Sequence, residues 1–435
     1  MVLFKTNFGG RFLIAIITFI IVFGLIVIVH EFGHYYLAKK SGILVRQFSI
    51  GMGPKLVSYT KNHTLYTIRL LPLGGYVMLA GAEDDDEELK PGTIIGLKLN
   101  ADEQVIKIDN SQQTNDADLI PLQVSQSDLQ KDLYIEGYVS GDEQTLHRYA
   151  VHHDATIVDE TGTEMQIAPQ DVQFNSASLL NRFLTNFAGP FNNLIFGIIV
   201  YIISAFLIGG PLSSGNKLGE IQPNSPAAAV HLQAGDQITR VGNQKVNNWE
   251  QLAQEIAKRP KKATPLTVQK ANHKIVQVTV HPKAVKNGKE VIGQIGIMPQ
   301  RDHRFGPTLK SGFVSAFSSM GIIFNALKQM VTGGFNINQL GGPVAIYSQT
   351  SQVAAMGYKQ VIVFIAWLSI NLGIMNLLPI PALDGGKLLL NIIEAIRRKP
   401  VSQKTEIIIN LIGVAFLVML MVAVTWNDIT RFFIK

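Results

Sequence analysis

The chain has 435 residues, of which 47% are hydrophobic and 16% are charged, with a net charge of +6 and no cysteine. This composition is too apolar for an ordinary soluble enzyme and fits a membrane protein with soluble insertions. The lack of cysteine excludes disulfides, a thiol nucleophile and a thiolate metal ligand. Lysines and arginines are scattered and form no basic stripe, so no nucleic acid partner is expected.

Four stretches are apolar and long enough, at about 18 to 20 residues, to cross a bilayer as helices. They cover approximately residues 12–29, 192–209, 361–378 and 407–424. Lys5 and Arg11 precede the first stretch, as in a signal peptide, but no small-residue cleavage site follows it. We therefore expect that the first apolar stretch is not cleaved off but spans the membrane. The chain is then a polytopic α-helical membrane protein with four transmembrane helices embedded in the lipid bilayer.

Positive residues between the third and fourth spans set the expected orientation. They are Lys387, Arg397, Arg398, Lys399 and Lys404. Cytoplasmic loops carry such an excess, so this connection is predicted to be cytoplasmic in a bacterial cell membrane. Both termini are then extracytoplasmic, residues 30–185 lie inside and residues 210–360 lie outside. The C-terminal ends of the first and third spans face the same side, toward the cytoplasm.

Residues 68–79, with the sequence IRLLPLGGYVML, are apolar but too short to span and are interrupted by proline and glycine. We expect a membrane re-entrant β-hairpin here. Such a hairpin could add a strand to an unwound substrate through its backbone. The residues expected to bind substrate in this way are Tyr66, Gly74, Gly75, Tyr76, Val77 and Met78. A packed hairpin with a purely structural role is the open alternative.

The remaining segments predict soluble parts. From residue 83 the composition changes to EDDDEE and then to alternating strand-like stretches, which indicates a cytoplasmic acidic and β-rich insertion. Residues 213–298 alternate strand-like runs with one helical pattern at 249–257, typical of a compact α+β binding module. Residues 312–331 contain too many polar residues for a span and predict an amphipathic surface helix.

The expected order of parts is the first span with its motif at 1–60, the re-entrant hairpin at 61–82, the insertion at 83–180, the second span at 181–210, the extracytoplasmic module at 211–300, the amphipathic helix region at 301–350, the third span at 351–400 and the fourth span at 401–435.

The sequence HEFGH, residues 30–34, ends the first span. His30 and His34 are four residues apart, so on a helix both imidazoles project from one face and can share a zinc ion. Glu31 lies beside them and can accept a proton from water. The pattern is short and arises by chance, but these groups are costly at membrane depth unless they are partnered. A metal site is therefore favoured over three wetted residues at a helix end.

A catalytic zinc usually takes three protein ligands, and Asp384 is the best candidate for the third. It lies in NLLPIPALDGG, residues 376–386, where two prolines break the third span and two glycines allow close backbone approach. Asp384 could instead cap the helix that follows. The predicted topology favours the metal role, because it puts Asp384 on the same membrane face as His30 and His34.

Together, HEFGH and NLLPIPALDGG resemble the motifs of the site-2 protease family of intramembrane zinc metalloproteases. Residues 48–56, 73–81, 182–193 and 340–346 match the family as well, so the resemblance covers nearly the whole chain. Residues 225–236 resemble part of a PDZ domain. The regulator of sigma-E protease of Gram-negative bacteria has two such domains, so one module is closer to the Gram-positive branch.

The resemblance implies regulated intramembrane proteolysis of single-span membrane proteins or signal-peptide remnants, after a first cut by another protease. The substrate partner would be a transmembrane segment, and the PDZ-like module would bind a peptide C-terminus or exclude bulky substrates. Asn376 matches the family's motif asparagine and would be a further catalytic residue that bonds substrate or intermediate.

Two alternatives belong to other classes of protein. A non-catalytic PDZ-bearing membrane receptor or scaffold would not need Glu31 or Asp384, and both residues are present. A metal transporter would use intramembrane histidine and aspartate, but more often shows repeated halves, and the sequence has no such repeat.

Overall fold

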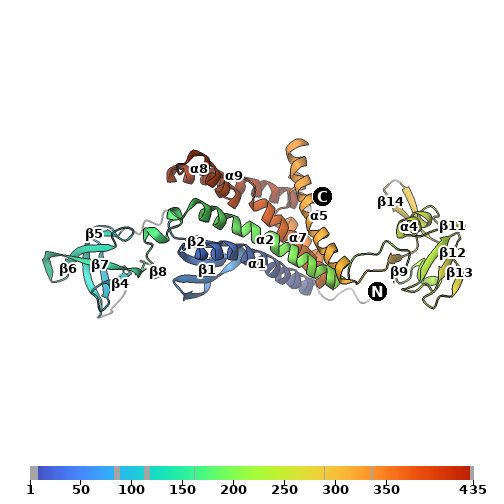
Figure 1. Ribbon diagram of the computed structural model, residues 1–435, viewed down its shortest axis with the longest axis horizontal. Helices are drawn as coiled ribbons and strands as arrows, with labels where there is room; N and C mark the ends of the chain where they lie inside the picture. The colour runs from blue at the N-terminus through green and yellow to red at the C-terminus, as the bar shows by residue number, and fades with distance from the viewer. Residues whose placement is uncertain are drawn as a thin grey trace. The chain divides into compact units, whose positions relative to one another are not determined.

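A computed structural model describes residues 8–82, 89–111, 118–160, 162–288, 290–334 and 337–431 (Figure 1). The acidic run at 83–88 lies outside these residues. The chain divides into two compact units, Met1–Gly197 with Ser319–Lys435 and Ile198–Ser318. The first unit contains the candidate site.

Four helices in the described part of the chain are long and apolar enough to cross a membrane, which confirms the four expected spans. They are α1 (Phe8–Lys40), α2 (Leu179–Ile208), α7 (Tyr358–Asn376) and α9 (Gln403–Ile429). The apolar window of α7 is 44% buried and that of α9 only 11%, so α7 is the central helix and α9 the most peripheral. All four helices begin before the predicted apolar spans, and α7 ends at Asn376, two residues before the predicted end of its span.

Two long strands, β1 (Val45–Lys61) and β2 (Thr64–Leu79), form an antiparallel pair that follows α1. Ser49 pairs with both Thr67 and Tyr76, so the first part of β1 lies between two parts of β2. Residues 76–79 therefore form an outer edge, and no other described strand pairs with it. The structure differs here from the expected hairpin, which was confined to residues 68–79. Residues 45–61 are extended as well, so the turn of the hairpin lies at Asn62 and His63, both at positive φ.

The sheet runs alongside the last turns of α1. At one end, Lys39 Nζ donates to the Asn62 carbonyl at 3.1 Å. Further along, Gly75 packs against Val27 and Glu31. Glu31 and Lys39 are eight residues apart, about 12 Å along a helix. Several apolar side chains of the sheet are exposed, namely Met52, Leu56, Val57, Ile68, Leu70 and Leu71. The sheet thus extends from the polar end of α1 toward its apolar part.

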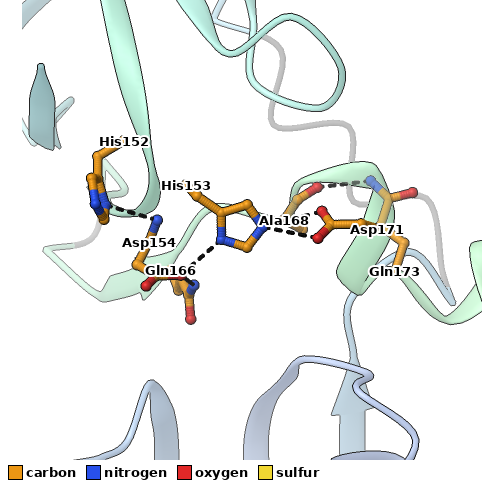
Figure 2. Close-up of polar contacts among 7 residues, drawn as sticks. All are labelled: His152, His153, Asp154, Gln166, Ala168, Asp171 and Gln173. Atoms are coloured by element: carbon orange, nitrogen blue, oxygen red, sulfur yellow. Dashed lines mark hydrogen bonds and ion pairs between the residues drawn. The ribbon is translucent and has the colours of Figure 1, made fainter.

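A six-stranded sheet follows, in the order β4-β3-β5-β6-β7-β8, and a parallel pairing of β4 with β7 closes it on itself. Its strands are β3 (Ile94–Leu99), β4 (Val105–Asp109), β5 (Ile120–Asp128), β6 (Tyr134–Val139), β7 (Asp142–Val158) and β8 (Glu164–Gln166). Alternating apolar residues such as Leu97, Ile108 and Leu122 fill the interior. The one-turn helices η1 (Gln170–Val172) and η2 (Phe174–Ser176) then lead to α2. His153 of β7 bonds Asp171 of η1 (Figure 2).

The second unit holds a compact α+β module. Its main sheet has the order β11-β10-β12-β13, and its helices are α3 (Pro226–Ala229) and α4 (Trp249–Ala257). The strands are β9 (Leu218–Ile221), β10 (Gln237–Val241), β11 (Gln244–Lys245), β12 (Thr264–Gln269), β13 (Ile275–Val280), β14 (Lys283–Asn287), β15 (Glu290–Gln294) and β16 (Ile297–Pro299). The side chains of Ser225 and Asn248 cap the two helices. Leu252, Ile256 and Leu266 belong to the buried core.

Three helices complete the fold. The expected amphipathic helix is α5 (Phe305–Thr332), and the short helix α6 (Pro343–Met356) was not expected. Asp428 of α9 accepts hydrogen bonds from the backbone of Gly342 at 2.9 Å and Ala345 at 3.1 Å, which anchors the start of α6. The third of these α-helices is α8 (Asp384–Arg397), and the one-turn helix η3 (Ile337–Gln339) precedes α6.

Candidate metal site

The C-terminal third of α1 and the start of α8 bring together the three predicted metal ligands. His30 Nε2 and His34 Nε2 are 3.3 Å apart, and Asp384 Oδ2 lies 3.1 Å from the first and 3.4 Å from the second. All three side chains are largely buried. They form the one cluster of potential metal ligands among the described residues. Leu383, not Asp384, is the N-cap of α8, so the capping alternative for Asp384 does not hold.

The spacing of these three atoms fits a zinc ion. Ligand atoms about 2.0 to 2.1 Å from a tetrahedral zinc lie about 3.3 Å from one another. The three separations, 3.1, 3.3 and 3.4 Å, match that value. Two imidazoles and a carboxylate are also the donor set found at catalytic zinc sites, which leave a fourth position for water.

Hydrogen bonds from α2 orient both imidazoles. His34 Nδ1 donates to the Thr185 carbonyl at 2.8 Å, which leaves the Nε2 lone pair free for a cation. The amide of Asn193 lies 3.2 Å from His30 Nδ1, and its Oδ1 has no partner. With the amide turned by 180°, Oδ1 accepts the proton of Nδ1 and the orphaned oxygen is satisfied. Both rings then present Nε2 to the same point.

Glycines let α1 and α2 cross closely at this place. A Cβ at Gly33 would collide with the Ala188 carbonyl, and a Cβ at Gly189 would collide with the His34 imidazole. Gly385 and Gly386 likewise pack directly on the backbone of the preceding loop. Glycine is therefore required at these four positions, because the backbones that carry the ligands pack too closely to leave room for a side chain.

Glu31 lies between the metal-ligand cluster and the sheet. It is 9% exposed, and the charges of His30, His34 and Asp384 all act on it. A Cβ at Gly75 would lie 3.0 Å from Glu31 Cγ. The carboxylate is thus placed beside both the candidate metal position and the edge of β2.

The other predicted site residues fall into two groups. Tyr76, Val77 and Met78 lie on the outer edge of β2 and line a cavity, whereas Tyr66 bonds Tyr35 at 2.7 Å in an aromatic cluster and does not line it. Gly74 sits at a bend with φ of 80°. Asn376 is the last residue of α7 and makes no hydrogen bond to the cluster in the described part of the chain.

Thr185, Gly189 and Asn193 also belong to the site, although no motif in the sequence predicts a role for them. All three lie in RFLTNFAGPFNN, residues 182–193, at the start of a span. A buried amide and a glycine within an apolar helix were the available signals, because both are costly there unless a partner requires them.

The spans, the ligand cluster and the adjacent carboxylate define a membrane-embedded metallopeptidase. The profile of peptidase family M50 matches residues 18–420, nearly the whole chain. The chain therefore belongs to peptidase family M50. This membership confirms the expected site-2 protease resemblance, the peptidase activity and the zinc cofactor, and it does not favour a non-catalytic receptor or scaffold.

Relatives of similar length support the same assignment. The protease eep of Enterococcus faecalis is 48% identical over 96% of this chain and 99% of its own length. A Streptococcus pyogenes protein named as a zinc metalloprotease is 49% identical over 97% of this chain and its full length. A solved PDZ domain of an SdrC-like protein from Listeria innocua is 21% identical and covers 20% of this chain and 97% of that domain, with a TM-score of 0.18 that carries no argument.

Proposed function

We propose that His30, His34 and Asp384 hold the catalytic zinc and that the protein cleaves transmembrane segments from the cytoplasmic half of the bilayer. The observation that carries this proposal is the near-equilateral triangle of the three ligand atoms beside Glu31. When bound, zinc supplies a Lewis acid that activates water and polarises the peptide carbonyl. Glu31 accepts the proton of the attacking water and returns it to the leaving nitrogen.

The outer edge of β2 captures the substrate in this proposal. A helical segment conceals its peptide groups in internal hydrogen bonds, so it must unwind before attack. The free edge at 76–79 offers backbone partners to an extended strand, and Gly75 sets that edge against Glu31. Asn376, at the end of α7, hydrogen-bonds the substrate or the intermediate in this proposal. The exposed apolar residues of the sheet support its placement within the membrane.

The topology and the soluble parts complete the proposal. Both termini are extracytoplasmic, the β-rich insertion over 83–180 is cytoplasmic and the PDZ-like module over 211–300 is extracytoplasmic. Substrates are single-span proteins or signal-peptide remnants already trimmed by another protease. The module binds their new C-terminus or excludes bulky ectodomains.

Reconstitution into vesicles with a panel of single-span substrates tests the proposal. We expect cleavage within the cytoplasmic half of the substrate span, mapped by mass spectrometry, and loss of both bound zinc and cleavage in Asp384→Asn. A variant with undiminished zinc would rule out Asp384 as a ligand. Cuts confined to the extracytoplasmic half would overturn the topology.

A further inference from the structure

A cavity of about 710 Å³ lies beside the outer edge of β2. Its walls come from β2, η2, the start of α2, α8, the connection between α8 and α9, and the start of α9. Residues that line it include Tyr76, Met78, Lys387, Asn391, Glu394 and Glu406. A cavity of this size is large enough to hold a short peptide segment.

The cavity has one end near the candidate metal site and one end far from it. Lys387 follows Asp384 by three residues in α8, and it is close enough to act electrostatically on Glu31. In α9, Gly413 lies against Pro381, just before α8 begins. Glu406 precedes Gly413 by seven residues, about 10 Å along the helix. Lys387 therefore marks the metal end, and Glu406 marks the far end.

The charged residues that line the cavity are of two kinds. Arg182 and Glu394 neutralise each other through two hydrogen bonds of 2.5 and 3.0 Å. Lys387 and Glu406 have no ion-pair partner among the described residues. An unpaired cation thus lies at the metal end and an unpaired anion at the far end.

The side-chain amide of Asn391 gives independent evidence that a ligand binds in this cavity. Its side chain is 7% exposed, and its Nδ2 has no hydrogen-bond partner. A buried donor without an acceptor costs free energy, and such groups are rare unless a ligand or water completes them. A peptide carbonyl passing along the cavity would be a suitable acceptor.

We propose that this cavity holds the part of the substrate that continues from the scissile bond toward the cytoplasm, and that Lys387 and Glu406 select its charges. The inference rests on the proposed function. Lys387 faces the part of a bound segment next to the scissile bond, and Glu406 faces a part further toward the cytoplasm. The preferred segment is neutral or acidic at the metal end and carries Lys or Arg further out.

Charge-swap kinetics test the inference with the full-length protein, zinc and vesicles. Single-span substrates carry one Lys or one Glu at successive positions beyond the cleavage site. In the wild type, we expect Lys at the metal-end position to lower kcat/KM about three- to fivefold relative to Glu, as for a partly screened charge pair. Lys387→Glu should reverse that preference, and Lys387→Gln should abolish it. Glu406→Lys should reverse the preference for Lys at the outer position.

Lys404→Glu is the matched control, because Lys404 also lies in the first turn of α9 but does not line the cavity. It should leave both preferences unchanged. A photoreactive residue at Val401, which lines the cavity, should cross-link the cytoplasmic flank of a substrate in the Glu31→Gln background, whereas one at Leu389 should not. This readout does not require cleavage.

The possible outcomes separate the two proposals. Zinc-dependent cleavage that ignores flanking charge in the wild type and in Lys387→Glu would overturn this inference and leave the proposed function intact. Cross-links from Val401 to the extracytoplasmic flank would overturn it as well. Absence of cleavage of any membrane substrate by the wild type would contradict the proposed function, and this inference would fail with it.

Discussion

Gly75 of β2 lies directly against Glu31 of α1, with room for a hydrogen but not for a methyl group. A Cβ at Gly75 would lie 2.7 Å from the Ser49 carbonyl, 2.9 Å from Val27 Cγ1 and 3.0 Å from Glu31 Cγ. The edge that is proposed to bind substrate and the carboxylate that is proposed to move the proton are therefore held at van der Waals distance.

The Gly75→Ala variant should lose activity without losing zinc. The added methyl group displaces either the strand or the carboxylate, at a cost of about 1 to 3 kcal/mol. We expect kcat/KM for a membrane substrate to fall about tenfold or more. Gly24→Ala is the control, because a Cβ at Gly24 in α1 meets nothing within 4 Å. Unchanged kinetics in Gly75→Ala would show that the contact is unimportant.

Asn193 should support zinc binding through His30. The Asn193→Ala variant removes the group that holds His30 Nδ1, and loss of such a partner typically weakens metal binding about 10- to 100-fold. Competition with a chelator measures the change. Asn192→Ala is the neighbouring control, since among the described residues the Asn192 side chain bonds the Val29 carbonyl, at 3.3 Å, and not the ligand cluster. Equal zinc affinity in the two variants would remove Asn193 from the site.

The Arg182–Glu394 pair should stabilise the junction of α2 and α8. The side chains are 13% and 16% exposed. The Arg182→Met variant leaves a buried carboxylate unpaired, which costs about 3 kcal/mol or more, and adding Glu394→Leu should restore most of it. Thermal unfolding in detergent reports both changes. Arg148→Met breaks an exposed pair with Glu136 and should cost about 1 kcal/mol or less. Equal losses in the single and double variants would contradict this account.

The insertion should become less stable as pH rises from the unfolded pKa of His153 through its raised folded-state pKa. His153 bonds Asp154 at 2.9 Å and Asp171 at 3.1 Å, and these carboxylates raise the pKa of the imidazole (Figure 2). A raised folded-state pKa contributes stability below the unfolded value of about 6.5, and this stability is lost as pH rises through the folded value. Proteolysis of the 153–171 junction should therefore accelerate with rising pH in that window.

His152 provides the control for this pH effect. Its Nδ1 accepts a hydrogen bond from the Asp154 backbone at 3.1 Å, and among the described residues its ring makes no hydrogen bond or ion pair with a carboxylate (Figure 2). His153→Gln should abolish the pH dependence, and His152→Gln should keep it. Persistence of the pH dependence in His153→Gln would assign it to another group.

The features that could be predicted from the sequence are those with a local pattern. Four apolar runs predicted four spans, and the helix at 249–257 follows from its periodicity. The predicted topology identifies Asp384, because it puts the end of the Pro-broken third span on the same membrane face as HEFGH. The ligand cluster confirms that these residues meet.

Other features depend on contacts between distant segments. The sequence does not predict that residues 45–61 form a strand paired with β2. The first part of this strand is buried and the rest is exposed, so its apolar residues do not alternate regularly with polar ones. Thr185 and Asn193 reach the two histidines because α2 crosses close to α1. Gly33 and Gly189 allow that close crossing, but their contacts form between distant segments and cannot be read from the sequence. The unpaired amide of Asn391 likewise cannot be recognised from the sequence, because it depends on the burial of Asn391 in the wall of the cavity.

The most direct test of the central claim compares wild type and Glu31→Gln for zinc content and for cleavage of a single-span substrate in vesicles. The substitution keeps the shape of the side chain and the three candidate ligands. We predict full zinc occupancy with cleavage reduced by several orders of magnitude. Cleavage by Glu31→Gln at the wild-type rate would contradict the account.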